Sequence, residues 1–439
     1  MTLASLSLEQ APPISVPFRF FFSAPLFLLL AALALLAAGP AALQSRWTPA
    51  LLGITHLFTL GCMGMVMIGA MLQLLPVLAG SPVPNPRLAA WAIHLPLLAG
   101  TVLLCSGLYC ATAMLVTLAM PLLAFAFAAF LAMSIYSLAR APARNASTRA
   151  MLLALAALTL TLGLGLLLAA GITGLLDIPM LQLVTLHAGW GLLGWTTLLV
   201  AGVAYQVVPM FQLTPPYPRP FTRWLGNTLF VLMLLWSGHL LLPEPAAGRL
   251  ALFAAGGLAI CIAGFAVITL RLQQKRRRKV PDITLEFWRC GMICLLAAVL
   301  LWFAGQASTT LADSTFYALA LGMLFIIGFV LSVIQGMLYK IISFMIWFHL
   351  QGKLPSKQVP NMKVIIPDHA ARRHWRAHLA SLPLCLASAI WPMPWVYAAG
   401  CALLLAGVLL LANLYRAGSL YLRTVALISS AQGTQGTTG

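Results

Sequence analysis

Histidines in apolar surroundings are the residues of this sequence best suited to chemistry. Imidazole binds iron, copper and zinc and is the usual axial ligand of haem. Of the eight histidines, His56, His187 and His239 lie within or at the end of long apolar runs, where an ionisable side chain marks a functional site by default. We treat all three as candidate ligands; the alternative is a histidine that bonds a neighbouring helix or lies at the interface. His374 and His378, four residues apart in a basic stretch, could share a surface metal.

A thioether offers a second kind of ligand. Met323 falls five residues before Gly328, just as His56 falls five residues before Gly61. Methionine ligates haem iron in some cytochromes and also binds Cu(I). Met323 is therefore a candidate cofactor ligand, although methionine is also a common filler of apolar cores.

Three long apolar segments share a spacing that indicates an internal repeat. In each, a glycine is followed after 12 residues by Gln or Lys, and after three more by Pro or Ser: Gly61, Gln73 and Pro76; Gly194, Gln206 and Pro209; Gly328, Lys340 and Ser343. The period is 133 residues from Gln73 to Gln206 and 134 from Gln206 to Lys340. This pattern predicts three repeated units of four helices each, at about 18–140, 149–271 and 287–416.

The polar residue of each repeat is expected near the inner side of the membrane. Gln73, Gln206 and Lys340 could form a proton or ion entry there. Alternatively, the two glutamines bond carbonyls that Pro76 and Pro209 leave free, while Lys340 extends to the surface.

Composition restricts the class of protein. The chain has 439 residues, of which 62% are hydrophobic and 7% charged, and its mean hydropathy is +0.99. Soluble domains carry about 25% charged residues, so a soluble enzyme, a disordered chain and a nucleic-acid-binding domain are excluded. The eight cysteines include no CxxC pair, which argues against a disulfide framework. Twelve all-α membrane helices are predicted: 18–40, 50–79, 87–112, 114–139, 149–175, 179–212, 221–243, 248–271, 287–307, 314–349, 377–392 and 394–416.

Basic residues are distributed unevenly between the two sides. If both termini are cytoplasmic, the loops on the opposite side hold only Arg46 and Arg249, and nearly every other Lys and Arg is cytoplasmic. The net charge of +18 is then an orientation signal and not a nucleic-acid site. We expect a multi-pass protein of a bacterial-type inner membrane, with one transmembrane domain over 1–439 that includes a short cytoplasmic tail at 417–439.

Twelve helices in three groups of four resemble the catalytic subunit (subunit I) of the haem-copper oxidase superfamily, which includes cytochrome oxidases and nitric oxide reductases. The resemblance covers nearly the whole chain in topology but is partial in motifs. It implies that His56 is an axial ligand of a haem and that His187 is a copper or haem ligand. His239 stands where the family has two adjacent copper-binding histidines, and the family's His-x-His pair is missing before Gly328.

The resemblance implies a haem protein, with or without copper, in respiratory electron transfer or nitric oxide handling. A quinol or a cytochrome would be the electron donor. Because the set of metal ligands is incomplete and no acidic residue lies in the middle of a helix, oxygen reduction with proton pumping is not expected. The alternatives are a membrane transporter, for example of copper, and an assembly protein without a cofactor.

Overall fold

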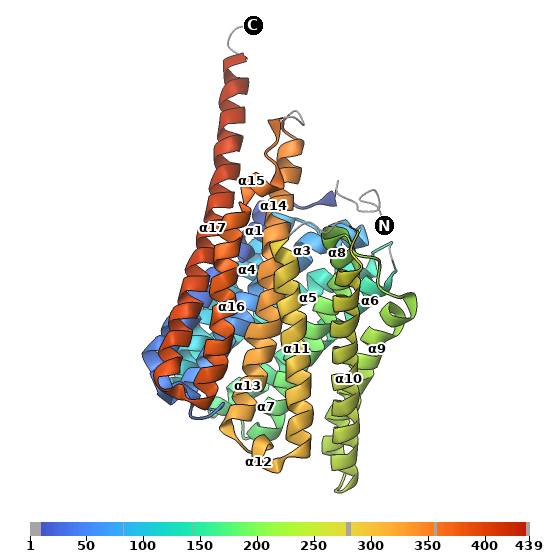
Figure 1. The fold of residues 1–439 in the computed structure, drawn as a ribbon, viewed down its shortest axis with the longest axis vertical. Coiled ribbons are helices and arrows are strands. Elements are labelled where there is room, and N and C mark those ends of the chain that lie inside the picture. Colours follow the sequence, from blue (N-terminus) through green and yellow to red (C-terminus); the bar gives the residue numbers. More distant parts are fainter. Residues whose placement is uncertain (1–9, 82, 143, 278–281, 355–357, 436–439) are drawn as a thin grey trace.

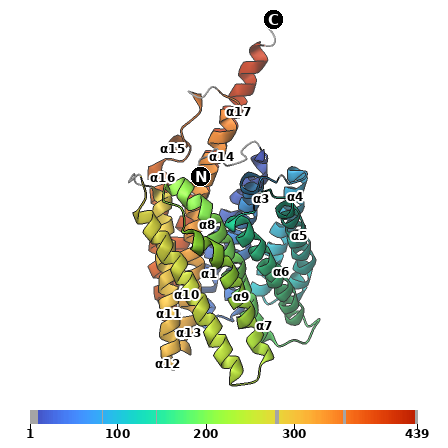
Figure 2. The ribbon, with the colours of Figure 1, turned by 90° about the vertical axis from the view of Figure 1, so that its right-hand side faces the viewer.

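The protein is an all-helical bundle. The computed structural model describes residues 10–81, 83–142, 144–277, 282–354 and 358–435, and within these residues it has no strand. Figure 1 shows long helices running roughly side by side, and the quarter-turn view in Figure 2 shows the same arrangement. The end of the bundle where α1 begins and α17 ends is called the termini end below, and the opposite end the far end. Part of the basic run that includes Arg276 and Lys279 lies outside the described residues.

The helices can be grouped by the three units expected from the sequence. The first unit contains α1 (Ser15–Ala38), η3 (Gly39–Leu43), α2 (Pro49–His56), η4 (Leu57–Gly64), α3 (Met65–Ala79), α4 (Pro86–Tyr109) and α5 (Ala113–Ala139). The second contains α6 (Ala146–Ile172), α7 (Met180–Gly189), η5 (Trp190–Thr196), α8 (Thr197–Gln212), α9 (Arg219–Gly238), η6 (His239–Leu241) and α10 (Ala246–Gln274). The third contains α11 (Ile283–Ala307), α12 (Thr309–Ala312), α13 (Thr315–Met323), η7 (Leu324–Leu331), α14 (Ser332–Gln351), α15 (Met362–Ile365), α16 (Asp368–Ile390) and α17 (Pro392–Gln435).

Eleven helices of the described residues are long and apolar enough to cross a membrane, where twelve were expected. The difference is α16, which is not among the eleven. It begins at Asp368 and not at 377, so its first turns carry Arg372, Arg373 and Arg376. A short tail was expected at 417–439. In the structure α17 instead continues past residue 417 as far as Gln435.

The same interruption recurs in the three core helices. Each changes from α-helical to π-helical hydrogen bonding over a short segment, and the segments η4, η5 and η7 begin at Leu57, Trp190 and Leu324. These starts are 133 and 134 residues apart, the period found in the sequence. Such π-helical turns are rare and are frequently found at functional sites. The recurrence therefore supports the repeat.

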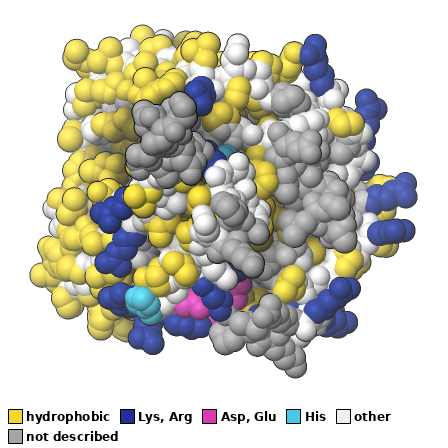
Figure 3. Space-filling view, turned by 90° about the horizontal axis from the view of Figure 1, so that it is seen from above, with side chains coloured by type: hydrophobic (Ala, Val, Ile, Leu, Met, Phe, Trp, Pro, Cys, Tyr) yellow, Lys and Arg dark blue, Asp and Glu magenta, His cyan; other side chains and the backbone are white. Residues whose placement is uncertain are grey.

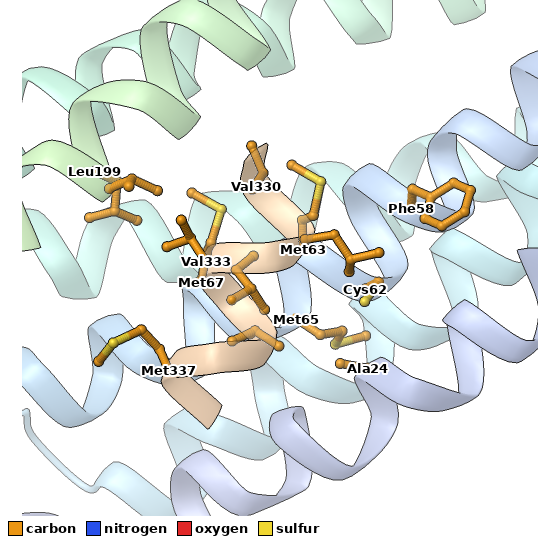
Figure 4. Packing of buried hydrophobic residues seen from close by; sticks show 14 of the residues in the cluster. Ala24, Phe58, Cys62, Met63, Met65, Met67, Leu199, Val330, Val333 and Met337 are labelled. Carbon is orange, nitrogen blue, oxygen red and sulfur yellow. The ribbon is translucent and has the colours of Figure 1, made fainter. Parts of the chain in front are cut away.

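The core helices also meet at a common axis. Near the termini end, a small cavity of about 40 Å³ is lined by positions that correspond in the three units: Leu74, Val207 and Ile341, and Val77, Met210 and Phe344. Farther along, Met67, Leu199 and Val333 pack together with Met63 and Met337 (Figure 4). Met63 and Met67 are thus part of the buried core. Corresponding residues of three units that line one small cavity are what stacked repeats produce.

The termini end is the basic face of the molecule. Viewed from that end, Lys and Arg side chains are spread around the surface (Figure 3). Arg46 and Arg249 belong instead to connections at the far end, between η3 and α2 and at the start of α10. This segregation of charge is the one expected from the sequence.

Candidate metal or haem site

A large cavity occupies the far half of the bundle. Its volume is about 1290 Å³, and its lining is drawn from all three units. Most lining residues are apolar, while Arg46 and Asp313, from connections at the far end, also contribute. Cofactor pockets are typically about 300–1,000 Å³, mostly apolar and with a few convergent polar groups. This cavity is therefore large enough for a flat macrocycle.

His56 and His187 lie next to each other in this cavity. His56 is the last residue of α2, and His187 lies near the end of α7. The centres of the two imidazole rings are 6.2 Å apart, and the ring planes differ by only 21°. Both side chains are half-buried and line the cavity. The sequence predicted two ligands, but it did not predict that they would come together.

Backbone carbonyls fix the orientation of both rings. His56 Nδ1 lies 2.8 Å from the carbonyl oxygen of Leu52 on its own helix. His187 Nδ1 lies 3.0 Å from the carbonyl oxygen of Thr161 on α6. A carbonyl only accepts hydrogen bonds, so Nδ1 carries the proton in each neutral ring and Nε2 keeps its lone pair. This is how proteins prepare a histidine to bind a metal.

Helix α6 also makes room for the His187 ring. A Cβ atom added to Gly165 would lie 3.0 Å from His187 Cε1 and 3.4 Å from its Nδ1. Thr161, one turn earlier on the same helix, supplies the carbonyl that holds the ring. Helix α6 therefore positions the His187 ring in two ways: the carbonyl of Thr161 accepts its hydrogen bond, and Gly165, which has no side chain, leaves space for the ring.

The spacing of the two rings fits one ion held between them. An imidazole bound through Nε2 at about 2 Å places its ring centre roughly 3.2 Å from the ion, so two such rings on opposite sides have centres about 6.3 Å apart. The observed distance is 6.2 Å. The chemistry of the donors, two neutral nitrogens in an apolar cavity, suits haem iron and copper.

The π-helical segments begin beside the candidate ligands. η4 starts directly after His56, η7 directly after Met323, and η5 three residues after His187. In η5, Thr196 Oγ1 donates to the carbonyl oxygen of Gly191, five residues earlier. The shared glycine of each core helix lies inside these segments, but the spacing alone did not reveal the π-helical turn.

The other two candidate ligands lie in different places. Met323 lines the cavity. His239 is in η6 at the far end, is not among the lining residues, and places Nδ1 against the carbonyl oxygen of Trp236. Within the described ranges, no three His, Cys, Asp or Glu side chains are close enough together to hold a metal ion. His187 is thus brought to His56 and not to His239.

The inner polar positions differ from one another. Lys340 Nζ forms an ion pair of 2.7 Å with Asp282, and both side chains are partly exposed. Gln73 is buried, and its Oε1 has no hydrogen-bond partner among the described residues. Gln206 is half-buried. The ion pair with Asp282 gives Lys340 a local partner.

Sequence reasoning misplaced His374 and His378. They were expected in the basic loop and the start of the next helix, as a pair on one helical face that could share a surface metal. In the structure both are fully buried on α16, and each bonds a side chain of α14. Because several arginines surround these two histidines in the sequence, the segment has the composition of an exposed loop, and its buried face could not be recognised.

Comparison with family models and with curated proteins finds no match for this sequence. The function must therefore be argued from the fold and the site. What the fold and composition establish is a multi-pass, all-α membrane protein in contact with lipid.

Proposed function

We propose that this chain is a membrane haem protein in which His56 and His187 provide the two axial ligands of one haem. One observation carries the proposal: two cavity-facing imidazoles lie 6.2 Å apart, with nearly parallel planes. Their Nδ1 atoms are held by carbonyls, which leaves both Nε2 atoms available. The volume of the cavity suits a macrocycle.

Such a haem would serve electron transfer. When bound through two imidazoles, haem supplies a one-electron carrier that has no free coordination position for oxygen. The role of the chain is to hold both rings, exclude water with an apolar lining and fix the tautomers. A quinol or a cytochrome remains our candidate donor, and respiration or nitric oxide handling the candidate context.

The resemblance to haem-copper oxidase subunit I remains part of the proposal. The common axis of the three units supports it. The family pairs the haem-binding histidine of helix 2 with one in helix 10, whereas here His56 faces His187. We therefore infer a divergent member without the copper site. The basic termini end would face the cytoplasm of a bacterial-type inner membrane.

An optical spectrum of the purified protein tests the proposal. Cells supplied with a haem precursor should yield protein with a Soret band and the sharp visible bands of a low-spin, six-coordinate haem after reduction. His56→Ala and His187→Ala should each lose or shift these bands. His239→Ala is the matched control and should retain them. Protein without haem, or spectra that neither cavity variant changes, would refute the assignment.

Copper is the second candidate for the same site. Met63 and Met323 line the cavity, and thioether sulfur with imidazole suits Cu(I). Metal analysis of the same preparations separates the two: copper that is lost in His56→Ala, together with no Soret band, favours a copper carrier. Neither haem nor copper would favour the assembly role.

A further inference from the structure

A second set of polar side chains lies buried on α16. His374, His378, Ser381, Cys385 and Ser388 follow one another at intervals of four and three residues, so they share one face of the helix. All five are at most 2% exposed. Residues on other faces of this helix, such as Arg373 and Leu379, are exposed. A polar stripe in the interior of a membrane protein is costly and marks function.

Side chains of α14 and α17 join the stripe near the termini end. Tyr339 Oη and His374 Nδ1 are 2.7 Å apart, and Ser332 Oγ and His378 Nε2 are also 2.7 Å apart. Asn413 Nδ2 donates to Tyr339 Oη at 3.0 Å. Tyr339 Oη and His374 Nδ1 therefore share a hydrogen bond whose donor depends on the tautomer of the ring.

Several atoms of this cluster lack partners. His374 Nε2, His378 Nδ1 and both polar atoms of the Gln335 side chain are buried without a hydrogen bond among the described residues. Gln335 lies on the face of α14 that also carries Ser332 and Tyr339, because it is three residues from Ser332 and four from Tyr339. Buried polar atoms of this kind are normally satisfied by ordered water. The cluster thus combines titratable rings with the sites that water would fill.

The stripe leads from the termini end to the large cavity. Cys385 and Ser388 are among the residues that line the cavity. From His374 to Ser388 the helix rises about 21 Å at 1.5 Å per residue. At the other end, Arg372 on the preceding turn forms a partly exposed ion pair of 3.1 Å with Glu286 of α11.

We propose that this polar stripe, with bound water, transfers protons between the termini end and the cavity. Each ring accepts a proton on one nitrogen and releases one from the other, while Tyr339 and Ser332 exchange theirs with their histidine partners. The charged groups around the route are the pairs of Glu286 with Arg372 and of Asp282 with Lys340. This goes beyond the proposed function and does not depend on haem, because the stripe lies on helices that carry neither His56 nor His187.

Proton flux into vesicles tests the inference. The full-length protein is reconstituted into liposomes that contain a trapped pH-sensitive dye, and a potassium diffusion potential is imposed with valinomycin. Wild type should pass protons faster than protein-free vesicles. Tyr339→Phe and Ser332→Ala each remove one hydroxyl, and each should slow the flux by about tenfold or more, because the relay loses one of its members.

Tyr205→Phe is the matched control. Tyr205 is the corresponding residue of the preceding unit, 134 positions earlier, and its hydroxyl has no partner among the described residues. Tyr205 is not on the proposed route, so the proton flux of the Tyr205→Phe protein should equal that of wild type. Thermal unfolding of every variant checks folding. Wild-type flux no higher than that of protein-free vesicles would overturn the proposal, as would equal effects of Tyr339→Phe and Tyr205→Phe. A missing Soret band would count only against the haem assignment.

Discussion

Gly165→Ala should weaken the site without touching either ligand. The added Cβ would lie 3.0 Å from His187 Cε1, where ordinary contacts begin at 3.4 Å. The ring must therefore move by about 0.4 Å, which exceeds the tolerance of about 0.2 Å for a metal–ligand distance. Changes that act through a ligand's support typically reduce metal affinity about 10–100-fold. We expect haem affinity to fall by about tenfold, with a shifted spectrum.

Gly163→Ala on the same helix is the control. A Cβ at Gly163 would meet nothing within 4 Å, so this variant gains only the helix preference of alanine, about 0.5–1 kcal/mol. Haem titration of the apoprotein, followed at the Soret band, measures both affinities. The reasoning fails if Gly165→Ala binds haem as tightly as Gly163→Ala with the same spectrum.

Three further predictions concern the scaffold and the chemistry. Asn145→Ala should lower the free energy of unfolding by about 1 kcal/mol, measured as a lower thermal midpoint, because Asn145 and Thr148 form a reciprocal cap at the start of α6, both bonds being 3.0 Å; an unchanged midpoint would contradict this. Lys340→Met should change stability by less than about 1 kcal/mol, since its ion pair with Asp282 is partly exposed, and a larger loss would point to a functional role. The purified protein should show no cyanide-sensitive oxygen uptake and no turnover-linked proton pumping with quinol or cytochrome donors, as an oxygen electrode and a pH electrode would measure; robust uptake would mean that residues such as Met323 complete a second metal site.

The sequence predicted most of the architecture because membrane helices are strongly constrained. A long apolar run in a membrane must form a helix, and the repeated spacing around Gln73, Gln206 and Lys340 marks the three core helices. For α16 the helix predicted at 377–392 is present, but its first turns from Asp368 and its buried polar face were missed, because arginines occupy its other faces. Mean hydropathy does not distinguish a basic loop from a helix that buries one narrow face.

The candidate site was predicted only in part for a related reason. The positions of the histidines along their predicted helices could be inferred from the sequence. The distance between His56 and His187 could not, because it depends on how α2, α6 and α7 pack. His187 takes its orientation from the carbonyl of Thr161, 26 residues away in the chain. Local pattern contains no information about such a contact.

The π-helical segments have a geometric consequence for how this fold can vary. One extra residue in a helix rotates everything beyond it by about 100°, since an α-helix has 3.6 residues per turn. Each of η4, η5 and η7 therefore sets the rotation of the far half of its core helix about the helix axis, relative to the half that packs at the common axis. A ligand at position 56, 187 or 323 can be turned toward a different sector of the cavity while the axial packing stays unchanged.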